Sequence, residues 1–163
     1  MLDATTQVFD IQTVSTIQPS NGAPVVAFGG GLVARLPPDH PDRDKMLREA
    51  ENSLQQRRPV GLLANGDGLI LELSHAHETS VRSVREDEED KSRLAVWFWE
   101  YSPVCYLTRQ HPAFDRIRAT LEQAAASGTR VWLANRMHLM ESKTEVWWTI
   151  LDVRPIEWPA SGR

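Results

Sequence analysis

Two histidines separated by a single residue, His75 and His77, are the clearest candidates for chemistry in the sequence. On one β-strand their side chains point to the same face, where two imidazoles can bind one zinc ion. Zinc needs further ligands, and the candidates are His138, Glu78 and Glu141. The spacing fixes none of these, and no cofactor is expected. We therefore keep a metal-dependent or general acid/base enzyme using His75 and His77 as an alternative function, with catalytic residues unknown.

Two other histidines, His40 and His111, each stand directly before a proline in the order Leu-x-x-x-His-Pro. Proline suits the first position of a helix, because the N–H that it lacks would have no helical partner there. Twin bases or ligands are one interpretation of this pair. We predict instead that each ring bonds a neighbouring backbone group at the start of a helix.

The other motifs that could carry chemistry fit structural roles. Cys105 lies in an apolar segment and is predicted to be buried, not a nucleophile. As the only cysteine it cannot form an internal disulfide, which favours a reducing, cytoplasmic location. No Gly-x-Ser-x-Gly motif marks a catalytic serine. The glycine-rich segments 29–31 and 65–68 are predicted to be turns, since they lack the features of phosphate and calcium loops.

Six tryptophans all lie in the second half of the chain: Trp97, Trp99, Trp132, Trp147, Trp148 and Trp158. Trp97 and Trp99 alternate with Val96 and Phe98, so a strand that carries them is apolar on both faces. Such a strand is buried on both faces or offers one to a partner. For most of the tryptophans we favour packing in the core; Trp97, Trp99 and Trp147 are the candidates for an interface or ligand platform. A small-ligand sensor with an aromatic pocket is a second alternative.

Charge and composition argue against several classes of partner. A net charge of −4 gives no basic surface for nucleic acid or for anionic membranes. The longest apolar run, 94–99, is far shorter than the ~20 residues that span a bilayer. The N-terminus also lacks a signal-peptide pattern. An aromatic platform for single-stranded nucleic acid would need flanking basic residues. Those available are Arg93, Arg109, Arg116, Arg118 and Arg130.

The chain matches itself when residues 25–63 are aligned without a gap to residues 96–134. The His-Pro pair is shared, and the alignment places Trp97 and Trp99 against Val26 and Phe28. A residue kept in both copies serves the fold, whereas a residue found in one copy can serve function. We predict a tandem duplication, with pseudo-repeats at about 7–74 and 77–153.

Each pseudo-repeat is predicted to contain three strands, one helix and two strands. Apolar residues recur at helical spacing after each His-Pro pair: Met46, Leu47, Ala50 and Leu54, then Phe114, Ile117, Leu121 and Ala125. The acidic run 86–90 alternates with basic neighbours and is predicted to be a solvated hairpin tip.

These elements predict an α+β fold, a mainly antiparallel bent sheet or barrel-like β structure with two helices. We expect one domain over 1–163, with the repeats merged into one sheet and 154–163 forming an irregular tail. The predicted function is that of a non-enzymatic interaction or assembly module. It would self-associate through its Trp-rich second half, as a homo-oligomer or with a protein partner, and bind neither nucleic acid nor membrane.

Overall fold

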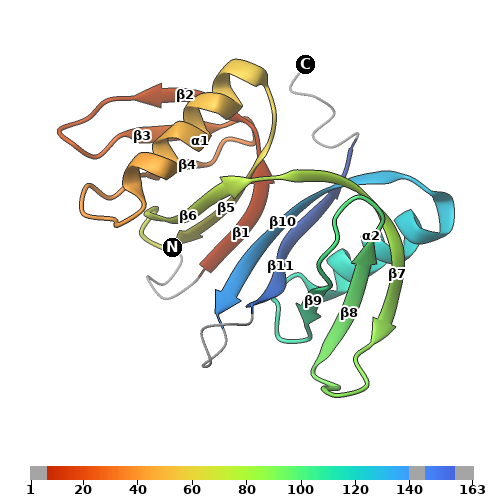
Figure 1. Cartoon of the computed structure of the whole chain (residues 1–163). Helices are drawn as coiled ribbons and strands as arrows, with labels where there is room; N and C mark the ends of the chain where they lie inside the picture. Colours follow the sequence, from red (N-terminus) through yellow and green to blue (C-terminus); the bar gives the residue numbers. More distant parts are fainter. Residues whose placement is uncertain (1–6, 140–145, 157–163) are drawn as a thin grey trace. The chain divides into compact units, whose positions relative to one another are not determined.

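The computed structural model describes residues 7–139 and 146–156, which divide into two compact units. The first unit ends at Ala76 and the second begins at His77. Two helices and mainly antiparallel strands make up the described residues (Figure 1), so the α+β prediction is confirmed. Neither helix is long and apolar enough to cross a membrane.

The first unit consists of two three-stranded sheets and one helix. Its elements are β1 (Gln7–Gln12), β2 (Val14–Gln18), β3 (Val25–Phe28), β4 (Val33–Arg35), α1 (Arg43–Gln56), β5 (Val60–Asn65) and β6 (Ile70–His75). The sheets have the orders β1-β5-β6 and β2-β3-β4, and all their strand pairs are antiparallel. A single parallel bridge joins Arg35 to Leu69.

The two glycine-rich segments of this unit are turns, as predicted. Gly31 has φ +90° and donates its N–H to the carbonyl of Phe28 at 3.0 Å, which closes the turn between β3 and β4. Gly68 has φ +76°, and the Asn65 side chain accepts the N–H of Leu69 at 3.0 Å. Both glycines take left-handed backbone angles that other residues rarely adopt.

Helix α1 packs most of the face that we predicted, with Leu47 partly buried against the core and one position exchanged. Met46 and Ala50 are buried as expected, but Leu54 is exposed and Ser53 takes the inward position instead. The Ser53 hydroxyl accepts the N–H of Val14 at 3.0 Å and donates to a carbonyl beyond the helix. A polar side chain can be buried here because both of its hydrogen-bonding roles are satisfied.

The second unit is a closed five-stranded barrel with one helix. Its elements are β7 (His77–Glu86), β8 (Arg93–Phe98), β9 (Cys105–Thr108), α2 (Phe114–Ser127), β10 (Arg130–Leu139) and β11 (Val146–Pro155). The strand order is β10-β11-β9-β8-β7, and β7 closes the barrel on β10. All pairs are antiparallel except β9 and β11, which run parallel at Cys105 and Trp148.

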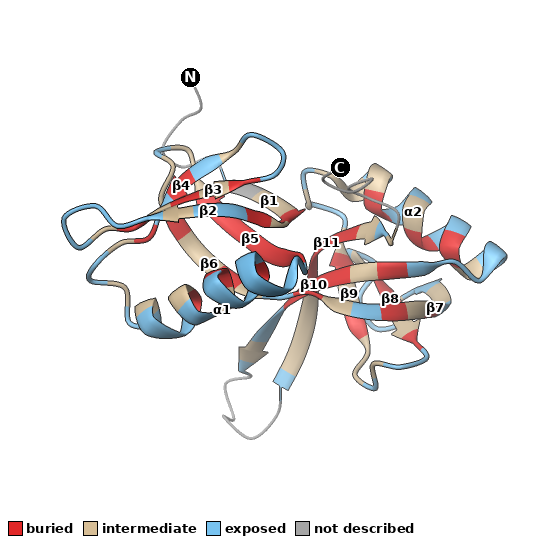
Figure 2. Cartoon of the chain, turned by 90° about the horizontal axis from the view of Figure 1, so that it is seen from above, coloured by how far each residue is buried: buried red, intermediate tan, exposed pale blue. Residues whose placement is uncertain are grey.

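Alternating strand residues fill the interior of this barrel. Leu94, Val96 and Phe98 of β8 point inward, and Ile117 and Leu121 of α2 are fully buried. Figure 2 shows the same alternation as red segments along the strands and on one side of each helix. Because β-strand side chains alternate between faces, the residues between these inward positions must point away from the core.

Two expectations about the larger arrangement need correction. Every strand pair among the described residues joins strands of one unit, so the three sheets do not form the single merged sheet that we favoured. β11 continues through Pro155, which extends regular structure into the segment predicted to be an irregular tail. Residues 157–163 of that segment, including Trp158, lie outside the described residues.

Candidate functional site

His75 and His77 do not share a strand, so the geometric premise of the zinc prediction is wrong. β6 ends at His75 and β7 begins at His77, and the boundary between the two units falls between them. The His77 ring packs against Tyr101, with ring centroids 4.8 Å apart. Within residues 7–139 and 146–156, no group of three or more His, Cys, Asp or Glu side chains could hold a metal ion. Glu141, one of the proposed further ligands, lies outside those residues.

His40 and His111 make the same hydrogen bonds in the two units, which confirms their predicted backbone contacts. Nε2 of His40 donates to the carbonyl of Leu71 at 2.8 Å, and Nε2 of His111 donates to that of Leu151 at 2.6 Å. In both, Nδ1 accepts the backbone N–H two residues ahead at 3.0 Å. One nitrogen donates and the other accepts, so each ring is neutral. Burial lowers the pKa of His111, which favours the same neutral form.

Cys105 is a buried core residue, as predicted. Its side chain is 0% exposed, and burial raises the pKa of its thiol to about 11. The side-chain amide of Asn135 makes a weak contact with Sγ at 3.8 Å. The thiolate is the reactive form of cysteine, so this thiol is a poor nucleophile at neutral pH.

The tryptophans of β8 lie on the outer face of the barrel. Val96 and Phe98 point into the core, whereas Trp97 is half-buried and Trp99 is 65% exposed. Trp99 follows the last residue of β8, and its N–H donates to the carbonyl of Ser80 at 2.9 Å. An indole this exposed, held by a strand backbone, is a fixed apolar surface open to solvent.

Trp147 belongs to an aromatic row that crosses four neighbouring strands. Its ring stacks on His138 of β10 at 4.5 Å and lies 6.3 Å from Tyr106 of β9. The guanidinium of Arg93, on β8, lies 3.8 Å from the centre of the Tyr106 ring. The Thr149 hydroxyl is 2.8 Å from Nε2 of His138. Trp147 was predicted as part of a platform, but its own neighbours already contact its ring.

Tyr106 was not singled out from the sequence, although the alternation of β9 carried a signal for it, and His138 was named only as a possible zinc ligand. Tyr106 stands between Cys105 and Leu107, which are both 0% exposed. A residue between two inward positions of a strand must face outward. His138 lacks any such signal, because its stacking depends on the pairing of β10 with β11 opposite Trp147.

All five arginines that could have flanked a nucleic-acid platform form ion pairs. The pairs are Arg93 with Asp87, Arg109 with Glu86, Arg116 with Asp152, Arg118 with Glu122, and Arg130 with Glu78 and Glu100. Their charges are therefore largely compensated within the second unit. This agrees with the negative net charge of the chain and weakens the case for a basic groove.

Arg82 differs from those five and was not singled out from the sequence. Its guanidinium lies 5.0 Å from the centre of the exposed Trp99 ring. No ion pair of Arg82 is present among the residues that the structure describes. The pair therefore presents an uncompensated positive charge next to a large apolar ring, a combination that is enriched at protein interfaces.

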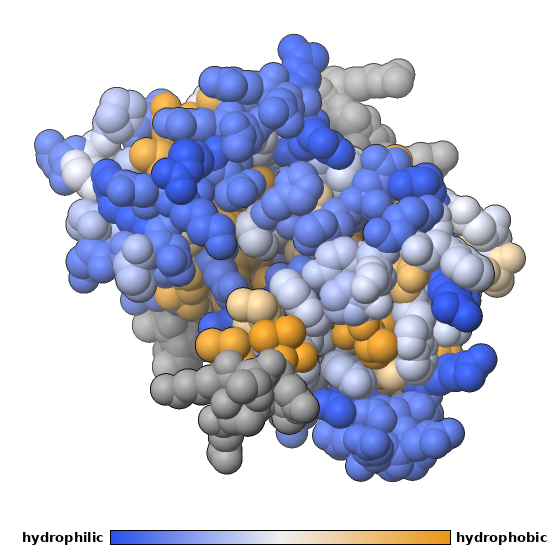
Figure 3. Space-filling view, in the orientation of Figure 1, coloured by the Kyte–Doolittle hydropathy of each residue, from blue (hydrophilic) through white to orange (hydrophobic). Residues whose placement is uncertain are grey.

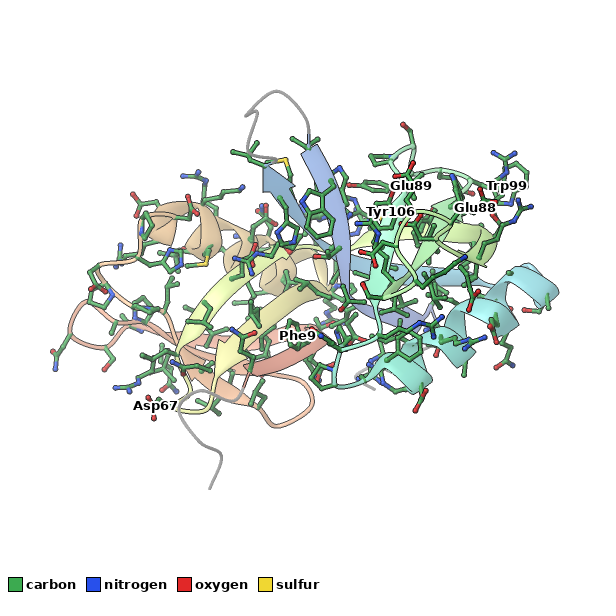
Figure 4. The ribbon with its side chains drawn as sticks, turned by 90° about the horizontal axis from the view of Figure 1, so that it is seen from below. Phe9, Asp67, Glu88, Glu89, Trp99 and Tyr106 are labelled. Carbon is green, nitrogen blue, oxygen red and sulfur yellow. The ribbon has the colours of Figure 1, made fainter. Side chains whose placement is uncertain are left out.

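The loop between β7 and β8 is an acidic, solvated hairpin tip, as predicted. The Arg93 guanidinium donates to Asp87 and the Ser92 hydroxyl donates to Asp90, and these hydrogen bonds lower the pKa of both carboxyls. Glu88 and Glu89 are exposed and form no ion pair within the described part of the chain. Figure 4 labels both glutamates on the barrel unit, which it views from below. Glu88 and Glu89 are therefore exposed carboxylates at the tip, flanked by the exposed Arg85 and Lys91, which also form no ion pair in the part of the chain that the structure describes.

The hairpin of β10 and β11 continues beyond the barrel as an apolar ribbon. β7 pairs with β10 only over Arg130–Leu133, whereas β11 accompanies β10 to its last residue. Met137, Leu139 and Val146 are 50%, 63% and 49% exposed. Leu139 pairs directly with Val146, so these two side chains share a face. Figure 3 shows hydrophobic surface gathered at this end of the hairpin.

The groups exposed on the barrel unit are therefore suited to contact with another molecule. They comprise an indole beside a guanidinium, two carboxylates at a hairpin tip, and the apolar ribbon. No protein-family model, curated protein or solved structure matches the chain.

Proposed function

We propose that the protein is a non-enzymatic interaction module that self-associates through its second unit. The observation that carries this proposal is the exposure of Trp99, which is 65% accessible and lies beside Arg82. Tryptophan and arginine dominate the binding energy of many protein interfaces. A reducing cytoplasm is the proposed location, and the single buried Cys105 supports it.

The distribution of exposed apolar side chains supports the same proposal. Within the described part of the chain, only Val33 and Leu54 of the first unit are large hydrophobic residues with high exposure. The second unit has Trp99 and the apolar ribbon. Contiguous apolar surface on a monomer marks an interaction site more often than scattered residues do.

A single-stranded nucleic acid is a less suitable partner than protein. The barrel has the strand order of the OB fold, with its helix between the third and fourth strands, and OB folds bind oligonucleotides on strands two and three. Here those strands are β8 and β9. Their basic residue Arg93 is paired with Asp87, and the adjoining hairpin tip is acidic. Fold alone does not decide function, and these charges repel a phosphate backbone.

We also propose that the two units arose by tandem duplication. The matching hydrogen bonds of His40 and His111 support this proposal. So does the parallel contact that joins the strand before each helix to a segment after it, between Arg35 and Leu69 in one unit and between β9 and β11 in the other. A duplication would explain why the exposed tryptophan is found once, since one copy can keep the fold while the other gains an interface.

The mass of the protein in solution tests self-association directly. We expect native mass spectrometry and light scattering to give a multiple of the 18.4 kDa chain mass that dissociates on dilution. The variant Trp99→Ser should dissociate at concentrations at least about tenfold higher, as expected for a central interface tryptophan. Val33→Ser is the matched control, because it removes an exposed apolar side chain from the first unit. A wild-type monomer at every concentration would refute the proposal.

A further inference from the structure

We infer that two copies of the chain pair through the β7–β8 hairpin, arranged antiparallel about a twofold axis. The inference rests on the proposed self-association and specifies the surface that carries it. It starts from two features of this hairpin: a base, formed by Arg82 and Trp99, and a tip, formed by Glu88 and Glu89. Each feature lacks a charge partner within the described residues, and each is the complement of the other.

The base of the hairpin offers an aromatic ring with one free positive charge. Arg82 is exposed and stacks over Trp99 at 5.0 Å. The backbone that carries this ring is held across the hairpin, because the backbone N–H of Trp99 donates to the carbonyl of Ser80. A carboxylate from a partner would pair with the guanidinium while the rest of the partner covers the indole.

The tip of the hairpin offers free negative charge, because only some of its acidic groups are compensated. Glu86 pairs with Arg109, and Arg93 lies within 4 Å of both Asp87 and Asp90. Glu88 and Glu89 are exposed between these compensated residues, and the exposed Arg85 and Lys91 leave the segment from Arg85 to Arg93 with more acidic than basic groups. The tip is therefore suited to a basic group on a partner.

The base and the tip of one hairpin cannot satisfy each other. β7 is an extended strand that runs from His77 to Glu86. Extended chain rises about 3.3 Å per residue, so roughly 20 Å separates Arg82 from Glu88. An ion pair needs contact within about 4 Å. Within the described residues, these two features can therefore meet only between two molecules.

A second copy of the chain is the partner that supplies both opposite charges at once, a carboxylate for the base and a guanidinium for the tip. When two identical hairpins lie antiparallel about a twofold axis, the tip of each one meets the base of the other. The same contact then forms twice, as in any isologous interface. A different partner would need a basic and an acidic group at the matching separation, whereas a second copy has them by symmetry.

Charge reversal tests this arrangement in the full chain. We expect Arg82→Glu to weaken self-association at least about tenfold, because it replaces attraction by repulsion in both symmetric contacts. Glu88→Arg combined with Glu89→Arg should have the same effect. An equimolar mixture of these two proteins should associate again, since every contact between unlike copies pairs opposite charges. Native mass spectrometry distinguishes the mixed dimer by the mass difference between the variants.

The control and the contrary outcomes separate this inference from the proposed function. Arg48→Glu makes the same charge change on an exposed position of α1 and should leave the dimer unchanged. Circular dichroism should give folded spectra for all variants, whose altered side chains are solvent-exposed. A wild-type dimer unaffected by either reversal, or variants that stay monomeric when mixed, would refute the hairpin interface. Self-association would then be assigned to the apolar ribbon. A monomeric wild-type chain would refute both proposals.

Discussion

The two units share the same local hydrogen bonds before their helices but expose different side chains. In each, a histidine before the helix hydrogen-bonds a strand carbonyl and a backbone N–H. Only the second unit adds an exposed tryptophan with an unpaired arginine and an apolar ribbon. The contrast separates residues that hold the fold from residues available for contact. This is why the proposed interface lies on the second unit.

The units also differ in how their strands close on one another. In the second unit, β9 and β11 pair at two successive positions and complete a closed barrel. In the first unit the parallel contact is the isolated bridge between Arg35 and Leu69, and the strands remain in two separate sheets. The second unit is therefore expected to depend more on the residues that fix β11.

The largest loss of stability is expected from replacing Asp152, which lies on β11 of the second unit. Its side chain is 0% exposed and pairs with Arg116 and Arg154. Asp152→Ala would leave two guanidinium groups without this partner, and we expect the free energy of unfolding to fall by about 3 kcal/mol. Urea unfolding followed by tryptophan fluorescence measures this unit selectively, because all six tryptophans lie beyond residue 77.

A surface ion pair on the same unit provides the control for Asp152. Glu122 pairs with Arg118 along α2, and both side chains are about half exposed. Glu122→Ala should therefore change stability by less than about 1 kcal/mol. Equal losses in the two variants would show that the buried carboxylate has no special role in closing the barrel.

The next largest effect tests whether the two histidines are equivalent. His40→Ala and His111→Ala each remove two hydrogen bonds from the start of a helix. Each should lower the stability of its own unit by about 2 kcal/mol. Hydrogen exchange resolved by peptide can assign each loss to one unit. A loss confined to one variant would break the equivalence, and a change in self-association would contradict a purely structural role.

The sequence predicted the backbone roles of these histidines because local rules determine them. A His-Pro pair at a helix start and a glycine with positive φ in a tight turn depend on a few neighbouring residues. The zinc alternative assumed that His75 and His77 share a strand, and this assumption depended on where one strand ends. His75 ends β6 and His77 begins β7, a break that the alternating pattern of the sequence does not reveal.

The ungapped self-alignment does not match the inward residues of β3 with those of β8. It matched Val26 and Phe28 to Trp97 and Trp99, yet both residues of the first pair are buried and Trp99 is exposed. The inward residues of β8 are Val96 and Phe98. A shift of one residue moves every side chain of a strand to the opposite face. The sequence therefore predicted an exposed Trp99 only as one of two alternatives, the other being a strand buried on both faces. No feature of the sequence indicated that Arg82 would lie beside it.

The smallest loss of stability is expected from replacing Ser53, a position where the two helices have different residues. In the self-alignment it corresponds to Ala124, and both residues are buried on their helices. The serine hydroxyl accepts the N–H of Val14, so Ser53→Ala would leave that buried donor without its acceptor. We expect a loss of about 1 kcal/mol from the first unit, measured by peptide-resolved hydrogen exchange. Leu54→Ala should cost less, because that side chain is exposed.

Ser53→Ala also distinguishes two explanations of the difference between the helices. β1 ends just before Val14, where β2 begins, whereas β7 of the second unit is continuous. If the hydroxyl is needed only because of this break, then Ala124→Ser should not increase the stability of the second unit. A stabilising Ala124→Ser would show that the second unit also contains an unsatisfied donor near its helix. The first outcome would mean that the core of each unit fits its own strand breaks, while both units keep the same histidine contacts.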